Sequence, residues 1–178
     1  MVYDFRTRQD SPECTLDDAR TLIFSLELDK AGFLFWDTSS SVELEKLRNW
    51  VHSVDGLDLR RDILRACLLV SVSNCSVIPR KFQLEAGLAA YRGRSTIINA
   101  GTGSGKTLSM VIPLLMDQTA VAIIISPLKR LHSTQAKALE QFGIRPLVIN
   151  EDSKLSLEDI KVFAPYINCV IAARLMTP

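Results

Sequence analysis

The spacing of apolar residues changes near Pro79. In residues 1–76, apolar side chains recur every three to four positions, which is the period of amphipathic helices. From residue 77 onward, short apolar runs alternate with segments of helical period. This alternation is typical of βαβ units, in which helices cover both faces of a parallel sheet. The pattern therefore predicts a helical N-terminal segment over residues 1–76 and an α/β domain over residues 77–178.

Three helices are predicted before residue 77. Thr15 and Asp18 form the capping-box pattern that begins the first helix. The apolar face of this helix comprises Leu16, Ala19, Leu22, Ile23 and Leu26. The second helix begins at Ser40 and continues past Trp50, and the third covers residues 58–70. Residues 37–41, DTSSS, are predicted to form a loop between the first two helices.

The second region is predicted to contain short strands separated by helices. The strands are predicted over residues 96–100, 121–126, 146–150 and 167–173. The helices are predicted over residues 81–91, from about residue 106, and over residues 128–142. A further short helix is predicted to begin at Ser156, which forms a capping pattern with Asp159. Gly93 and Gly143 would end two of these helices, and Pro113 would kink or shorten a third.

Composition and charge narrow the class of protein. Hydrophobic residues make up 47% and charged residues 23%, and the net charge of +1 gives no general attraction for nucleic acid. The four cysteines form no C-x-x-C pair, so we expect buried thiols and no zinc site. The charged N-terminus is not a secretory signal, and the longest apolar runs are too short to span a bilayer. We therefore expect an intracellular protein with no membrane partner.

The stretch NAGTGSGKTL, residues 99–108, lies between a predicted strand and a predicted helix, as a phosphate-binding loop does. Gly103 and Gly105 permit backbone torsions that are closed to other residues, so that N–H groups can point at phosphate oxygens. Lys106 would neutralise the outer phosphates, and the Thr107 hydroxyl would bind Mg²⁺. A plain strand-to-helix turn is the alternative, since the strict pattern has glycine at position 100. The predicted nucleotide-binding residues of this phosphate loop are Ala100, Thr102, Gly103, Ser104, Gly105, Lys106 and Thr107.

The sequence AGTGSGKT resembles motif I of superfamily II helicases, in which Ala commonly replaces the first Gly. Gln83 lies 23 residues before Lys106, and Gly93-Arg94 follows it at the spacing of the Q motif, with Ser95 in place of the usual Asp. The resemblance implies that the Gln83 amide reads the adenine edge of ATP, since an amide offers both a donor and an acceptor. Arg80 is similar to the arginine of the RecQ version of this motif. A solvated helix residue is the alternative for Gln83.

Residues 125–135, ISPLKRLHSTQ, resemble motif Ia of RecQ-type DNA helicases, S-P-L-x-x-L-x-x-D-Q. DEAD-box RNA helicases typically have P-T-R-E-L here, so this stretch favours a RecQ-type helicase and DNA over RNA. The TGSGKT of motif I, in contrast, is less typical of RecQ helicases. In the family, motif Ia touches the nucleic-acid backbone. The resemblance therefore implies phosphate contacts from Lys129, Arg130, Ser133 and Thr134, although Thr134 stands where Asp is usual. An ordinary helix start with a solvated polar face is the alternative.

A helicase of this superfamily also needs a D-E-x-H motif, whose carboxylates hold Mg²⁺ and activate the attacking water. The 178 residues contain no such motif. Glu151-Asp152 follows an apolar run, but the acids are in reverse order and no His follows; Glu158-Asp159 is a weaker candidate. Residues 174–178, RLMTP, resemble motif Ib only loosely. We therefore assign no catalytic residue. Because the D-E-x-H strand lies in the middle of the family's sheet, we expect exposed strand edges and marginal stability.

The resemblance covers residues 79–178 and implies an α/β fold: a partial RecA-like P-loop NTPase with a parallel sheet flanked by helices, preceded by the helical segment 1–76. It implies the ATP-binding part of a RecQ-like, 3′–5′ ATP-dependent DNA helicase, with ATP and Mg²⁺ as cofactors and a nuclear location. The alternative is a module that binds ATP and nucleic acid without hydrolysis or unwinding, because the carboxylate pair is missing. A small-molecule kinase shares the phosphate loop but predicts neither Gln83 nor the S-P-L segment.

Overall fold

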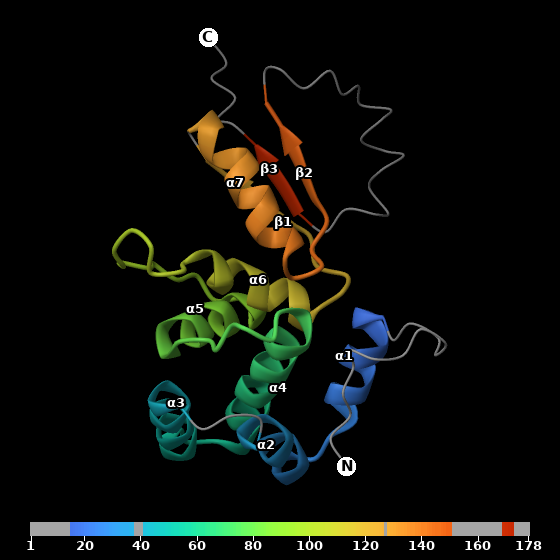
Figure 1. Ribbon diagram of the computed structural model, residues 1–178, viewed down its shortest axis with the longest axis vertical. Coiled ribbons are helices and arrows are strands. Elements are labelled where there is room, and N and C mark those ends of the chain that lie inside the picture. The colour runs from blue at the N-terminus through green and yellow to red at the C-terminus, as the bar shows by residue number, and fades with distance from the viewer. Residues whose placement is uncertain (1–14, 38–40, 127, 151–168, 173–178) are drawn as a thin grey trace.

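The computed structural model describes residues 15–37, 41–126, 128–150 and 169–172 (Figure 1). Helices α1 to α4 lie at one end of the molecule, and three strands with helix α7 lie at the other. Helices α5 and α6 lie between these two parts. The described residues thus form a helical N-terminal segment followed by an α/β region, and the predicted fold class, a partial RecA-like domain, is confirmed.

The described residues before position 77 form four helices: α1 (Leu16–Ser25), α2 (Leu28–Trp36), α3 (Val42–Ser53) and α4 (Leu57–Ser73). The predicted capping box of α1 is present, since the Asp18 N–H donates to Thr15 Oγ1 at 3.2 Å and the Thr15 N–H donates to Asp18 Oδ2 at 3.0 Å.

Two predictions for this segment were wrong. Helix α2 occupies residues for which no helix was predicted, although its buried residues, Ala31, Gly32 and Phe35, lie at helical spacing. Helix α3 is capped by Ser41, whose Oγ accepts from the Leu44 N–H at 3.1 Å, and not by Ser40, which lies outside the described residues.

Helix α4 lies at the centre of the molecule and contacts helices on both sides of residue 76, including α1, α2, α5 and α6. Its side chains Ile63, Cys67, Leu69 and Val70 are almost fully buried, and they belong to one core that continues into α5 and α6. Arg20 of α1 adds a polar link, because its Nε donates to the Leu115 carbonyl at the end of α6 (2.7 Å). The N-terminal helices therefore pack directly on the region that carries the phosphate loop, and a domain boundary near residue 76 stays a prediction.

Helices α5 (Lys81–Tyr91) and α6 (Thr107–Met116) pack closely against each other. A Cβ built on Gly87 would lie 2.7 Å from Ile112 Cβ, so the two helices can approach this closely only with glycine at position 87. Gly93, at φ 71°, follows the end of α5 as predicted. Pro113 lies inside α6, and the helix continues beyond it to Met116.

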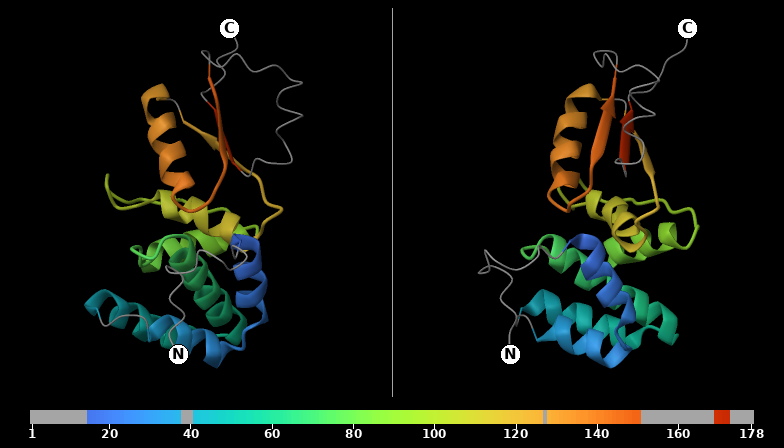
Figure 2. Two further views of the ribbon diagram at one scale, coloured as in Figure 1. Left: turned by 45° about the vertical axis from the view of Figure 1, so that its right-hand side comes forward. Right: turned by 90° about the vertical axis from the view of Figure 1, so that its right-hand side faces the viewer.

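The sheet contains three parallel strands, β1 (Ala122–Ile125), β2 (Pro146–Ile149) and β3 (Cys169–Ala172), in the order β1-β3-β2. Helix α7 (Lys129–Glu140) covers one face, as the right-hand view of Figure 2 shows, and buries His132, Ala136 and Leu139. On β1, Ile124 is buried, whereas its neighbours Ile123 and Ile125 are each 71% exposed. These two side chains therefore mark an open apolar area on the other face.

The predicted strand at residues 96–100 was wrong. This segment has no regular secondary structure and pairs with none of the described strands, and Ile97 is 99% exposed. A strand needs a neighbour to satisfy its N–H and C=O groups, and apolar sequence alone does not supply one. Among the described residues, no helix is long and apolar enough to cross a membrane.

Candidate nucleotide-binding site

The phosphate loop connects the extended segment after α5 to the first turn of α6. Gly103 and Gly105 both have φ of 79°, which confirms the left-handed backbone predicted for them. Lys106 is the N-cap of α6, and Thr107 is the first helical residue. The loop therefore leads directly into a helix N-terminus, where free N–H groups and the helix dipole favour an anion.

The surface of the loop is open. A Cβ built on Gly101 or Gly103 would have no atom outside the neighbouring residues within 4 Å, and Gly101, Thr102, Gly103 and Gly105 are all exposed. Lys106 folds back over the start of the loop, where its Nζ donates to the Ala100 and Gly101 carbonyls, each at 2.8 Å. An incoming phosphate group would have to replace these carbonyls as the acceptor for the ammonium group.

Two hydroxyl groups of the loop suit a metal-bound triphosphate. Ser104 Oγ is buried and has no hydrogen-bond partner among the described residues, and such an orphan group is unusual. Thr107, half-buried at the first turn of α6, offers a hydroxyl beside the N–H groups of the helix start. Hydroxyl oxygens are hard ligands of the kind that Mg²⁺ prefers, so the residues present fit Mg²⁺ with a nucleotide.

Gln83 lies beneath the loop and not beside an open cleft. Only 4% of the residue is exposed, and its Nε2 donates to the carbonyls of Ser104 (3.2 Å) and Gly105 (2.9 Å). Its Oε1 accepts from the backbone N–H of Arg80 at 2.7 Å, at the start of α5. The sequence spacing thus correctly brought Gln83 and the phosphate loop together. The direct contact between them was not predicted, and no sequence signal shows which way the amide points.

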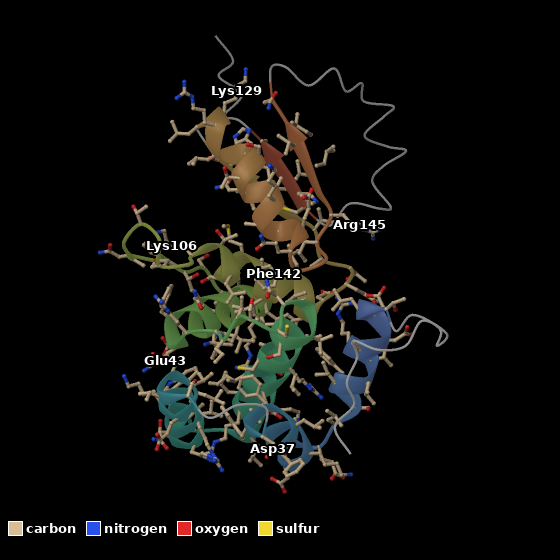
Figure 3. The ribbon with its side chains drawn as sticks, viewed as in Figure 1. Asp37, Glu43, Lys106, Lys129, Phe142 and Arg145 are labelled. Atoms are coloured by element: carbon tan, nitrogen blue, oxygen red, sulfur yellow. The ribbon has the colours of Figure 1, made fainter. Side chains whose placement is uncertain are left out.

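The four candidate nucleic-acid contacts, Lys129, Arg130, Ser133 and Thr134, lie in the first half of α7 and are exposed. Figure 3 shows Lys129 at the end of α7 that points away from α6, well apart from Lys106. His132, which lies between Arg130 and Ser133 in the sequence, is instead only 1% exposed. Its Nε2 hydrogen bonds to the Ser126 carbonyl at 3.0 Å. This contact fixes the end of β1 to the start of α7, so His132 holds the segment that presents the four polar side chains.

Within the described ranges, no group of three His, Cys, Asp or Glu residues is arranged to hold a metal ion. The Glu151-Asp152 and Glu158-Asp159 pairs, the short helix at Ser156, residues 174–178 and Cys14 lie outside the described residues.

The remaining three cysteines form no disulfide, and two of them are buried as predicted. Cys67 and Cys169 are fully buried, and burial raises the pKa of both thiols, that of Cys169 to about 11. The prediction was wrong for Cys75, which is exposed because it follows the end of α4 at the surface.

Comparison with known families tests the resemblance of this site to superfamily II helicases. The DEAD/DEAH box helicase family model matches residues 80–174, just over half of the chain. The chain belongs to the DEAD/DEAH box helicase family. The match begins at Arg80, so this DEAD/DEAH box region includes Gln83, the phosphate loop and α7.

The DEAD/DEAH box chain is similar to the ATP-dependent RNA helicase ROK1 of Meyerozyma guilliermondii, with 31% identity over 115 residues. These residues are 65% of the chain and 19% of that helicase, so the chain spans about a fifth of its relative. The comparisons thus support a helicase of the DEAD/DEAH box type. They give no support to the RecQ-like assignment, because the relative is named as an RNA helicase.

Proposed function

We propose that this chain is the ATP-binding part of an ATP-dependent nucleic-acid helicase. The observation that carries the proposal is the phosphate loop, in which two glycines at φ 79° lead into the N-terminus of α6. We assign the triphosphate to this loop, with Ala100, Thr102, Gly103, Ser104 and Gly105 providing its backbone. The membership of residues 80–174 in the helicase family supports ATP over other phosphate ligands.

Lys106 and Thr107 have distinct roles in this proposal. Lys106 exchanges its two carbonyl acceptors for oxygens of the outer phosphates, and its charge offsets theirs. Thr107 would supply a hydroxyl to Mg²⁺, and the ion would offset the negative charge of the phosphate groups. Arg80 is exposed at the start of α5, where its backbone N–H donates to Gln83 Oε1, and we propose it as a further nucleotide contact.

In the complete protein, we propose that ATP hydrolysis drives unwinding of nucleic acid. The alternative is that the chain binds ATP and nucleic acid but neither hydrolyses nor unwinds. The absence of D-E-x-H from the 178 residues favours this alternative for the chain by itself. Adding ATP, Mg²⁺ and nucleic acid to the purified chain distinguishes hydrolysis from binding alone. A chain that hydrolyses ATP produces inorganic phosphate faster than a Lys106→Ala variant, and a chain that only binds ATP does not.

The exposed face of α7 is the proposed contact with the nucleic-acid backbone. Lys129, Arg130, Ser133 and Thr134 suit phosphate oxygens, and such contacts weaken as salt is raised. The resemblance of motif Ia favours a RecQ-like enzyme that acts on DNA, and with that type would come 3′–5′ polarity and a nuclear location. The name of the relative favours RNA instead. Competition between single-stranded DNA and RNA of one sequence for the chain decides between them.

The nucleotide site is tested by thermal unfolding with and without ATP and Mg²⁺. A ligand that binds only the folded form at one hundred times its Kd stabilises it by about 2.7 kcal/mol, and we expect a corresponding rise in Tm. Lys106→Ala removes the ammonium group and is expected to abolish the rise. Lys46→Ala, which removes an exposed lysine from α3, is the control and should retain it. An equal rise in both variants would place the nucleotide elsewhere.

A further inference from the structure

Helix α6, which begins at the phosphate loop, receives little support from its own sequence. It is 10 residues long, and a helix of this length is only marginally stable by itself in water. Pro113 lies inside it and has no N–H to donate to the Ser109 carbonyl, four residues earlier. The last turn of α6 also contains no basic residue to offset the negative end of the helix. The position of α6 therefore depends on contacts from other parts of the chain.

One such contact comes from Arg20 of α1, in the N-terminal segment. Its Nε donates at 2.7 Å to the carbonyl of Leu115, in the last turn of α6, where carbonyls lack partners within the helix. Its Nη1 donates to Gln118 Oε1 at 3.0 Å, just beyond the end of α6, and to the Asp17 carboxylate within α1. Only 11% of the Arg20 side chain is exposed, so that salt screens its charge little. Arg20 thus supplies the positive charge that α6 itself lacks.

A second contact holds α5, the helix that packs against α6. Asp62 of α4 accepts through Oδ2 from Nε (3.2 Å) and Nη2 (2.5 Å) of Arg92, the C-cap residue of α5. Asp62 Oδ1 also lies 3.8 Å from Nη1 of Arg65, whose Nη2 donates to the Phe24 carbonyl of α1 at 2.6 Å. The side chains of Asp62, Arg65 and Arg92 are each no more than 30% exposed. Three partly buried charged groups therefore connect α1 and α4 to the end of α5.

These two contacts hold both ends of the segment 92–106, which contains the phosphate loop. Asp62 binds the side chain of Arg92, the first residue of this segment, and Arg20 holds the helix that follows its last residue. Helix α4 packs against both α5 and α6 (Figure 1). Because α5 and α6 meet at Gly87 and Ile112 without space for a further atom, a shift of one helix would displace the other.

We infer that helices α1 to α4 are a functional part of the nucleotide site, in which Arg20 and Asp62 are positioning residues that hold α6 and α5 and so fix the phosphate loop between them. This inference rests on the proposed nucleotide site. It assigns a role to residues that lie entirely before the part of the chain matched by the helicase family. Both side chains act through the two helices and not by contact with the nucleotide.

Each contact is removed by one substitution that has a matched control. Arg20→Met keeps much of the aliphatic stem but removes the donors to the end of α6, and Arg20→Lys, which keeps the charge, should lose less and serves if the Met variant fails to fold. Asp62→Asn removes the charge that faces α5. Its control is Asp58→Asn, the same change in the same helix at a side chain that is 91% exposed. The control for Arg20 is Arg48→Met, at an exposed position of α3.

Isothermal titration of the 178-residue chain with ATP and Mg²⁺, below the unfolding temperature of each variant, is the first measurement. Loss of one charge-assisted contact changes the equilibrium between positioned and displaced helices by about tenfold, and ATP affinity falls with the positioned fraction. We therefore expect a Kd about 3–10-fold higher in Arg20→Met and Asp62→Asn and unchanged in both controls. A purely structural role would lower Tm but leave the Kd of the folded variants unchanged, and that result would overturn the inference.

The second measurement needs no nucleotide. In NMR spectra of the free protein, the backbone amide signals of Gly103 and Lys106 should shift in Arg20→Met and Asp62→Asn, although both changes lie in other helices. The same signals should stay in place in the two controls. Unchanged loop signals in both test variants would overturn the inference. If the wild type does not bind ATP, the proposed function fails, whereas shifted loop signals would still support the positioning of the loop by α1 and α4.

Discussion

Gly87 is the position at which the packing of the site predicts the sharpest change in stability. In Gly87→Ala the new Cβ would lie 2.7 Å from Ile112 Cβ and 2.9 Å from Ile112 Cγ2, well inside van der Waals contact. Ala is favoured over Gly in a helix by about 1 kcal/mol. Overpacking of a filled core costs about 1–3 kcal/mol, and this site is at the upper end because a backbone carbonyl, Ser109 O, lies 3.1 Å away as well. We therefore expect a net destabilisation of about 1–2 kcal/mol.

Gly32→Ala is the matched control, since it makes the same change in another helix. A Cβ at Gly32 would have its nearest neighbour, Trp36 Nε1, at 3.5 Å, which is ordinary contact. Helix propensity then dominates, and we expect this variant to be stabilised by up to about 1 kcal/mol. Urea unfolding followed by circular dichroism measures both variants, and a change of 1 kcal/mol corresponds to about 2–4 °C in Tm for a chain of this size.

The comparison of the two variants also tests the link between packing and function. Since α5 carries Gln83 and α6 begins at the phosphate loop, separation of these helices should weaken ATP binding in Gly87→Ala but not in Gly32→Ala. If Gly87→Ala were as stable as Gly32→Ala, the close approach of α5 and α6 would not exist in solution.

Two further predictions concern the sheet and its thiols. Burial and its raised pKa, about 11, predict that the Cys169 thiol is not alkylated by iodoacetamide at pH 8, whereas the exposed Cys75 is. Peptide mass spectrometry measures the alkylation of both thiols. Alkylation of the two at equal rates would contradict the described burial. Because one edge of β1 is unpaired among the described residues and Ile123 is 71% exposed, we expect concentration-dependent association that Ile123→Lys reduces. Sedimentation velocity measures it, with Leu22→Lys on the exposed side of α1 as control, and an equal effect of both changes would exclude the strand edge as the contact.

Local signals in the sequence predicted the features that depend on neighbouring residues. The capping box at Thr15 and Asp18, the positive φ of Gly103 and Gly105, and the end of α5 before Gly93 follow from side chains and torsions within a few positions. Helix α2 has buried residues at helical spacing, Ala31, Gly32 and Phe35, but the exposed Phe33 and Leu34 add apolar residues to its solvent face and mask that spacing in the sequence.

The segment 96–100 shows why strands are harder to predict. Its residues Thr96, Ile97 and Ile98 have high β propensity, but a strand forms only where another strand accepts its hydrogen bonds. The described sheet has the order β1-β3-β2 and gives this segment no neighbour. Among the described strands, one edge of β1 has no partner.

The candidate site divides in the same way between local and distant contributions. The phosphate loop could be recognised because its function resides in consecutive residues, whose glycines, lysine and hydroxyl suffice to predict an anion site. The contacts of Gln83 with the loop could not, because they depend on the direction of an amide that lies more than 20 residues away along the chain. The spacing to Lys106 places that amide near the nucleotide, where it could face either the base or the loop. Only the hydrogen bonds from its Nε2 to the Ser104 and Gly105 carbonyls show that the amide faces the loop in this structure.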